Sequence, residues 1–196
     1  YSETYLQYNL IFHPTNPQDE QVIFQNNTIS VKSFPLKHRV PTTGFRFDEL
    51  PRNASIIREK ITNMNIPTVF FPLLKKGLDC VDIDGTVYKA SELTKAAPAP
   101  RSYAYCSDTR AFESYMDSVQ NVDLMYHEST FLHDMLERAE STLHSTSLEA
   151  AQVAKHVGAK RLLLGHYSAR YRDLIPLLEE AKLEFFNSEL SFEGKW

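Results

Sequence analysis

The sequence has 196 residues, of which 42% are hydrophobic and 23% are charged, so it can bury the core of one sizeable domain. Its formal net charge of -4 argues against a basic protein that coats nucleic acid, although a local basic patch could still bind phosphate. Its two cysteines, Cys80 and Cys106, provide no disulfide framework and are typical of a reducing cytoplasm. No apolar run reaches membrane-spanning length, and the first residues lack a signal-peptide pattern.

The first two segments of the chain differ in character. From Tyr5 to Lys37 the pattern predicts mainly β structure, because the runs LQYNLIF, QVIF and ISVKSF are separated by the turn-forming segments NPQDE and QNN. Between residues 50 and 101, a short helix is expected over 54–64. The prolines and scattered apolar residues after it favour an extended, protruding arm with little core of its own.

From Ser102 onward, short apolar runs alternate with helical patterns over 111–119, 131–141, 147–157 and 174–182. Such alternation predicts an α/β protein. The helix over 147–157 has the clearest boundaries, because Thr146 and Glu149 form a capping-box pattern and Gly158 is placed to end it.

Polar side chains end three of these apolar runs. SYAYCSD ends in Asp108, VDLMYHE in His127 and Glu128, and RLLLGH in His166. In α/β sheets, sites form where strands end and loops begin. We therefore expect these strand ends to meet in one site.

Other polar residues have an ordinary interpretation beside the functional one. Taken alone, His144 is most simply a surface-loop histidine, although a buried Glu128 would need a partner such as His144. We expect His133 and His156 to be surface or satisfied histidines. Lys75 and Lys76, beside Gly77, are most simply a solvated turn, and a phosphate contact is the alternative.

Imidazole and carboxylate groups are the ligands that zinc and similar divalent ions prefer. A carboxylate can bridge two ions spaced about 3.5–4 Å apart, an arrangement that hydrolyses phosphoesters. However, His38, Asp108 and His166 are too few to complete two catalytic ions, since each typically has about three protein ligands. The residues by themselves therefore lead no further than a metallohydrolase hypothesis.

Five motifs in order resemble the second half of ribonuclease Z, the tRNA 3′-end processing endonuclease of the metallo-β-lactamase superfamily. They are PLKHRVPTTGFRFDE, YCSDTR, YHESTF, HSTSLEAAQVAK and GHYSARY. The resemblance implies an αββα sandwich, of which residues 1–196 would be the C-terminal half. Residues 50–101 resemble the family's inserted exosite arm that grips tRNA, although Thr68 to Pro72 replace the usual Gly-Pro turn at its tip.

The resemblance also implies a role for each candidate residue. His38 would bind the first metal, Asp108 would bridge both metals, and His166 would bind the second. His144 would stabilise the transition state and protonate the departing ribose oxygen, and Glu128 would support it. The substrate-binding candidates are Ser168 and Arg170 at the mouth of the site, and Lys75 and Lys76 on the arm.

The family's HxHxDH signature, which supplies most of the metal ligands, does not occur in this sequence. We therefore expect a fragment that is inactive by itself. The parent protein is expected to be a cytoplasmic, homodimeric endoribonuclease that cleaves precursor tRNA. It is expected to use two divalent ions, which we expect to be zinc. Two alternatives stay open: another phosphodiesterase of the same superfamily, and a non-catalytic tRNA-binding or dimerisation module.

Overall fold

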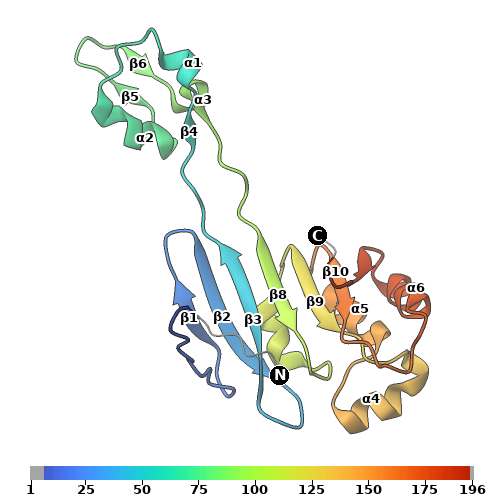
Figure 1. Cartoon of the computed structure of the whole chain (residues 1–196). Coiled ribbons are helices and arrows are strands. Elements are labelled where there is room, and N and C mark those ends of the chain that lie inside the picture. Colours follow the sequence, from blue (N-terminus) through green and yellow to red (C-terminus); the bar gives the residue numbers. More distant parts are fainter. Residues whose placement is uncertain (1–6, 195–196) are drawn as a thin grey trace. The chain divides into compact units, whose positions relative to one another are not determined.

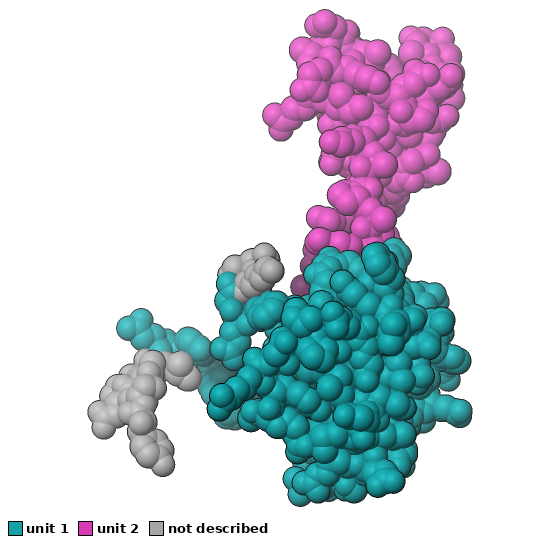
Figure 2. Space-filling view, turned by 90° about the vertical axis from the view of Figure 1, so that its right-hand side faces the viewer, with its two compact units in different colours: residues 1–25, 30–48, 102–196 teal, residues 26–29, 49–101 magenta. Residues whose placement is uncertain are grey.

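The computed structural model describes residues 7–194, which form two compact units (Figure 2). The first unit contains residues 7–25, 30–48 and 102–194, and the second contains residues 26–29 and 49–101. Among the described residues, no helix is long and apolar enough to cross a membrane.

A seven-stranded sheet is the framework of the first unit, with the strand order β1-β2-β3-β8-β9-β10-β11 (Figure 1). The strands are β1 (Gln21–Gln25), β2 (Ile29–Leu36), β3 (Thr42–Glu49), β8 (Ser102–Cys106), β9 (Leu124–Glu128), β10 (Leu162–Gly165) and β11 (Ser188–Leu190). β1 pairs with β2 and β3 with β8 in antiparallel fashion, whereas β8 to β11 are parallel. The short connection between the neighbours β2 and β3 requires an antiparallel pair as well.

This topology brings the carboxyl ends of β2, β8, β9 and β10 to one edge of the sheet. Hydrogen bonds tie the loops there together: the Lys37 amide donates to Thr109 Oγ1 at 3.1 Å, and the Arg110 amide donates to the Lys37 carbonyl at 3.1 Å. The Ser129 amide donates to the Gly165 carbonyl at 2.8 Å. The residues that follow these four strands are therefore held next to one another.

The alternation of strands and helices expected after Ser102 is confirmed. The helical elements are η2 (Glu113–Val119), η3 (His133–Met135), α4 (Leu136–Thr142), α5 (Ser147–His156) and α6 (Ile175–Glu184). Two of them depart in type, since η2 and η3 are 3-10 helices, and η3 precedes α4 within the helix expected over 131–141. The capping box of Thr146 with Glu149 is present at the start of α5, and Gly158 follows its end with a φ of +67°.

The two faces of the sheet differ. On one face α5 packs against β9, β10 and α6, and small alanines of α5 let the helix approach buried Met125, Leu162 and Leu164. The opposite face carries aromatic rings. Tyr105 stacks on Tyr126 with ring centroids 4.8 Å apart, and Tyr105 remains 36% exposed.

The second unit contains two small sheets and four short helical elements. They are β4 (Ser55–Ile56) paired with β7 (Thr94–Lys95), β5 (Cys80–Val81) paired with β6 (Val87–Tyr88), α1 (Arg58–Ile61), η1 (Thr68–Phe70), α2 (Phe71–Lys75) and α3 (Ala90–Leu93). The expectation of little core in this segment is wrong, since it buries a cluster of Ile66, Leu74, Cys80, Ala90 and Leu93. Turns at Gly77 and Gly85, both with positive φ, fold these widely spaced residues together, so no periodicity reveals them.

Two further expectations are wrong. Residues 7–12 form no strand, and Tyr5 and Leu6 lie outside the described residues. The helix expected over 54–64 is limited to α1, because β4 occupies Ser55 and Ile56 and pairs with β7. Strand pairing with a distant segment overrides the local helical pattern there.

Candidate metal centre

Glu128 is the anchor of a polar cluster at the sheet edge. Its side chain ends β9 with no exposed surface, and four groups donate to its carboxylate: Thr109 N at 2.6 Å, Thr130 Oγ1 at 2.6 Å, Ser145 N at 3.1 Å and His144 Nδ1 at 2.9 Å. Burial raises the pKa of Glu128, but the hydrogen bonds from His144 and Thr130 outweigh burial and hold it below the ordinary value of 4.5. The carboxylate is therefore ionised, and both of its oxygens are engaged.

His144 lies between the left-handed residue Leu143 and the cap of α5, with its side chain mostly buried. The hydrogen bond to Glu128 raises the pKa of His144 above 6.5, against the effect of burial, and the charge of Asp108 raises it further. The charge of Arg39 acts in the opposite direction. Because Nδ1 faces a carboxylate that only accepts, Nδ1 carries a proton and Nε2 is the atom left for substrate or metal.

His38 and His166 are oriented in the same way. His38 Nδ1 lies 3.1 Å from the Leu143 carbonyl oxygen, which can only accept, so this nitrogen carries a proton. His166 Nδ1 lies 2.9 Å from Thr130 Oγ1, whose own proton points to the Glu128 carboxylate at 2.6 Å. All three imidazoles therefore present Nε2, and second-sphere bonds of this kind fix the tautomer of a metal-binding histidine.

Asp108 completes the cluster. Its Oδ1 lies 3.1 Å from Nε2 of His166, and the ring of His144 neighbours those of His38 and His166, with centroid distances of 4.9 and 5.3 Å. Asp108 and His166 both have positive φ values, 53° and 55°. Residues other than glycine seldom adopt this conformation, and at functional sites it persists where surrounding contacts enforce it.

The donor atoms of this cluster suit a divalent ion. One set, from His38, Asp108 and His144, has all its atoms within 4.8 Å of one another, and a second set consists of Glu128, His144 and His166. Glu128 is the weak member, because hydrogen bonds already engage its oxygens. Imidazole nitrogens with one free carboxylate are a zinc-type ligand set.

The predicted phosphate ligands Ser168 and Arg170 adjoin this cluster. The Ser168 amide donates to the Thr130 carbonyl at 3.1 Å, and Arg170 Nε donates to Ser168 Oγ at 3.1 Å. The guanidinium of Arg170 also lies over the Phe131 ring, 5.1 Å from its centroid, and that ring packs edge-on against His144. An exposed cation is thus held beside the site by a ring and a hydroxyl.

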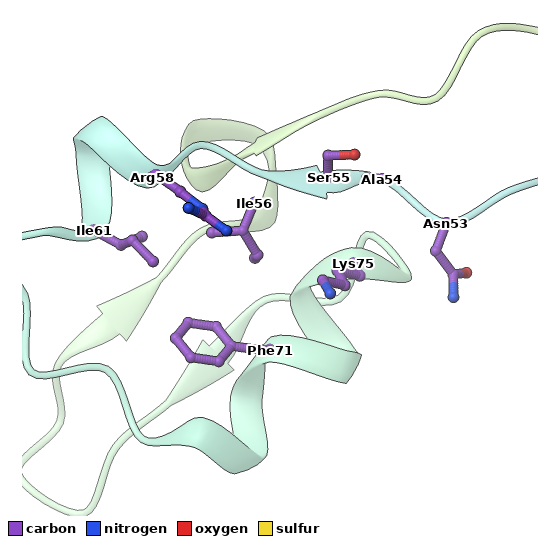
Figure 3. A pocket seen from close by; sticks show the side chains of 8 residues that line it. All are labelled: Asn53, Ala54, Ser55, Ile56, Arg58, Ile61, Phe71 and Lys75. Atoms are coloured by element: carbon purple, nitrogen blue, oxygen red, sulfur yellow. The ribbon is translucent and has the colours of Figure 1, made fainter.

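Lys75 and Lys76 belong to the second unit. Lys75 ends α2 and lines an open pocket of about 550 Å³, in which Phe71 extends from α2 below Ile56 and Arg58 (Figure 3). The pocket is therefore amphipathic, with two cationic side chains beside an aromatic ring. Lys76 follows at the end of α2 and is exposed.

Sequence reasoning missed several groups that order the site. Thr109 and Thr130 stand inside the motifs SDTR and HEST, so only their roles were missed. The Ser145 amide and the Leu143 carbonyl are backbone groups, for which a sequence offers no side-chain signal. Arg39 was also missed, although it follows His38 directly and lines an open pocket of about 580 Å³ together with Lys37.

Comparisons with known proteins agree with this architecture. No protein-family model matches the chain. Curated proteins named ribonuclease Z are similar: that of Parabacteroides distasonis is 41% identical over 96% of this chain and 62% of its own length, and that of Porphyromonas gingivalis is 40% identical over 91% and 59%. The chain thus spans about three fifths of the length of these relatives.

Solved structures share the fold. The metallo-β-lactamase-fold protein YhfI from Bacillus subtilis has a TM-score of 0.58 at 20% identity, over 93% of this chain and 54% of that one. A long-form RNase Z from yeast has a TM-score of 0.54 at 18% identity, over 85% and 17%. The sheet and its helices therefore have the metallo-β-lactamase fold.

Within that fold, the chain is a homologue of the curated ribonuclease Z proteins, so the resemblance that its motifs predict is confirmed.

Proposed function

We propose that the complete protein is an endoribonuclease that removes the 3′ trailer from precursor tRNA. It would leave a 3′-hydroxyl on the tRNA and a 5′-phosphate on the trailer. Identity of about 40% to curated ribonuclease Z proteins, over nearly the whole chain, is the observation that carries this proposal. The cluster of His38, Asp108, His144 and His166 supports it, because these side chains converge on one volume at the sheet edge.

Two divalent ions, which we propose to be zinc, would be held in part by His38, Asp108 and His166. Such ions supply a nucleophile from water and neutralise charge on the phosphate. The chain's own contribution is orientation. His38 and His166 present Nε2 because their Nδ1 atoms are engaged, and Oδ1 of Asp108 lies 3.1 Å from His166 Nε2. This geometry supports Asp108 as the ligand shared by both ions.

His144 would deliver a proton to the departing ribose oxygen. The ionised Glu128 holds Nδ1–H of His144 and raises the pKa of the ring, so that Nε2 also carries a proton over a wider pH range. The hydrogen bond between Nδ1–H and Glu128 leaves Nε2 to face the substrate, with Glu128 as the positioning carboxylate of His144.

The ligand number indicates that further residues are required. His38, Asp108 and His166 supply three side chains for two ions, whereas a catalytic zinc typically has about three protein ligands of its own. The curated relatives are longer than the chain described here. We propose that the part of their length that this chain does not span supplies the other ligands and covers the aromatic face around Tyr105 and Tyr126, as the other half of an αββα sandwich. The 196-residue chain alone would then be inactive.

RNA contacts would come from both units. In the first, Ser168 and Arg170 would meet a phosphate beside the metals. In the second, residues 50–101 would act as the exosite arm, with Lys75 and Lys76 as phosphate contacts. We further propose that the protein is a cytoplasmic homodimer in which one subunit's arm holds tRNA for the other.

A cleavage assay separates the three candidate functions. The complete protein, loaded with metal, is given precursor tRNA and a small phosphodiester such as bis(p-nitrophenyl) phosphate. Cleavage after the acceptor stem supports the proposal. Turnover of the small diester alone favours another phosphodiesterase of this fold. Binding of tRNA with neither activity favours the non-catalytic module.

A further inference from the structure

The side chains of Tyr115 and His127 form a hydrogen bond inside the apolar core, and none of the roles above uses them. Tyr115 Oη lies 2.7 Å from His127 Nε2, and both residues are almost completely buried. Phe34 and Phe112 enclose the phenol, with ring centroids 6.4 and 5.0 Å away. An apolar pair of similar size could fill this space without removing polar groups from water, so core stability alone gives no reason for the pair.

The direction of these hydrogen bonds follows from their acceptors. His127 Nδ1 lies 2.7 Å from the backbone carbonyl oxygen of Glu128, which can only accept, so Nδ1 carries the proton. Burial lowers the pKa of His127 and keeps the ring neutral. His127 Nε2 therefore accepts the hydroxyl proton of Tyr115. The chain of donors runs from Tyr115 through His127 to the backbone of Glu128.

The hydrogen bond from His127 holds the backbone of Glu128 at the point where β9 ends. Glu128 is the last residue of β9, and its pairing with Gly165 is the last one between β9 and β10. Beyond it, the chain turns towards the site, and the carboxylate of Glu128 must meet His144 Nδ1 at 2.9 Å. A working site needs its groups placed to within about 0.5 Å, by neighbours that are themselves fixed.

We propose that Tyr115 and His127 are positioning residues of the active site. They hold the backbone of Glu128 from inside the core, so that its carboxylate keeps His144 oriented. The proposal rests on the proposed function only for its kinetic consequence. The hydrogen-bonded path Tyr115–His127–Glu128–His144 is a property of the fold.

Two nearly isosteric variants of the complete protein test this. His127→Asn keeps an amide N–H at about the position of Nδ1, whereas His127→Leu has a similar shape and no donor. We expect the leucine variant to lose roughly 10- to 100-fold in kcat on precursor tRNA, with KM and metal content retained, and the asparagine variant to recover most of that loss. Equal kcat in the two variants, whether both high or both low, would overturn the proposal.

A measurement on the histidine ring separates this inference from the proposed function. In NMR spectra, the Nδ1 proton of His144 should stay protected from exchange in wild type and His127→Asn, and lose that protection in His127→Leu. If the protein cleaves no RNA but the proton behaves in this way, the proposed function fails and the positioning role stands. Unchanged protection in His127→Leu contradicts the positioning role, whatever the activity.

Tyr115→Phe is the second variant, for use if substitutions at His127 prevent folding. It removes only the hydroxyl that donates to His127 Nε2 and keeps the ring. A lowered kcat together with faster exchange of the His144 Nδ1 proton supports the pair. Wild-type values of both quantities overturn the proposal.

Discussion

The Nδ1 atom of His144 lies 2.9 Å from Oε1 of Glu128, a carboxylate with no exposed surface that also accepts from Thr109, Thr130 and Ser145. Removal of the imidazole tests what this pair does. In the complete protein, His144→Ala should reduce precursor-tRNA cleavage by roughly 10²–10⁴-fold, the usual contribution of a general acid, with metal content retained. His156→Ala, at an exposed position of α5, is the control and should leave cleavage unchanged. Loss of metal together with activity would show that His144 is a ligand.

The same pair should affect stability in a defined pH window. Glu128 has a lowered pKa, so its contribution is present above the ordinary value of 4.5 and is lost as pH falls through its folded pKa. His144 has a raised pKa, so its contribution is complete below 6.5 and is lost as pH rises through its folded pKa. In metal-free protein, the pair should therefore stabilise most between pH 4.5 and 6.5.

Glu128→Gln measures that contribution. Between pH 4.5 and 6.5, the substitution should lower the free energy of unfolding in urea by about 1–3 kcal/mol, the usual cost when a buried polar group loses its hydrogen-bond partner. The loss should shrink at higher pH, where His144 is neutral in the wild type. Glu140→Gln, on the exposed surface of α4, is the control. A pH-independent loss in Glu128→Gln contradicts the coupling to His144.

Gly165 lets β10 pass directly against the ring of Tyr126, since a Cβ atom at Gly165 would collide with that ring. Gly165→Ala should therefore destabilise the protein by roughly 1–3 kcal/mol, the usual cost of overpacking. It should also reduce cleavage, because His166 is the next residue. The double variant Gly165→Ala/Tyr126→Ala should be more stable than the sum of the single effects predicts. Additive losses, measured by urea unfolding, would show that the ring is not the obstacle.

Lys75 and Lys76 supply the test of RNA contact by the second unit. Replacing both by alanine in the complete protein should weaken tRNA binding and flatten its salt dependence, with a slope change of roughly 0.7–0.9 per lost phosphate contact. Hydrolysis of a small phosphodiester should hardly change. Lys155→Ala/Lys182→Ala removes the same charge from α5 and α6 as a control. Equal weakening by both double variants would indicate a general charge effect.

The sequence predicts the parallel part of the fold well, because short buried runs such as Leu162–Gly165 alternate with helices. The start of α5 is also recognisable, since the side chain of Thr146 caps it. The second unit is predicted poorly. Its core residues Ile66, Leu74 and Ala90 are separated by irregular turns, and contacts across such turns leave no periodic pattern.

The candidate site also has features that the sequence predicts and features that it does not. His166 and Asp108 are recognisable from their places after apolar runs, and their convergence follows from the parallel order of β8, β9 and β10. The tautomers of His38 and His166 cannot be predicted from the sequence. They depend on the Leu143 carbonyl, which accepts from His38, and on the acceptor to which the Thr130 hydroxyl donates. Such directions exist only once the loops are folded against one another.

The most direct test of the account is a mapped cleavage of precursor tRNA by the complete, metal-loaded protein and by Asp108→Asn. We predict one cut after the acceptor stem that leaves a 3′-hydroxyl on the tRNA, with this activity abolished and metal content reduced in Asp108→Asn, because Asp108 is the proposed shared ligand. Cleavage at the wild-type rate by Asp108→Asn, or no cut in precursor tRNA by a fully loaded wild-type protein, would contradict the account.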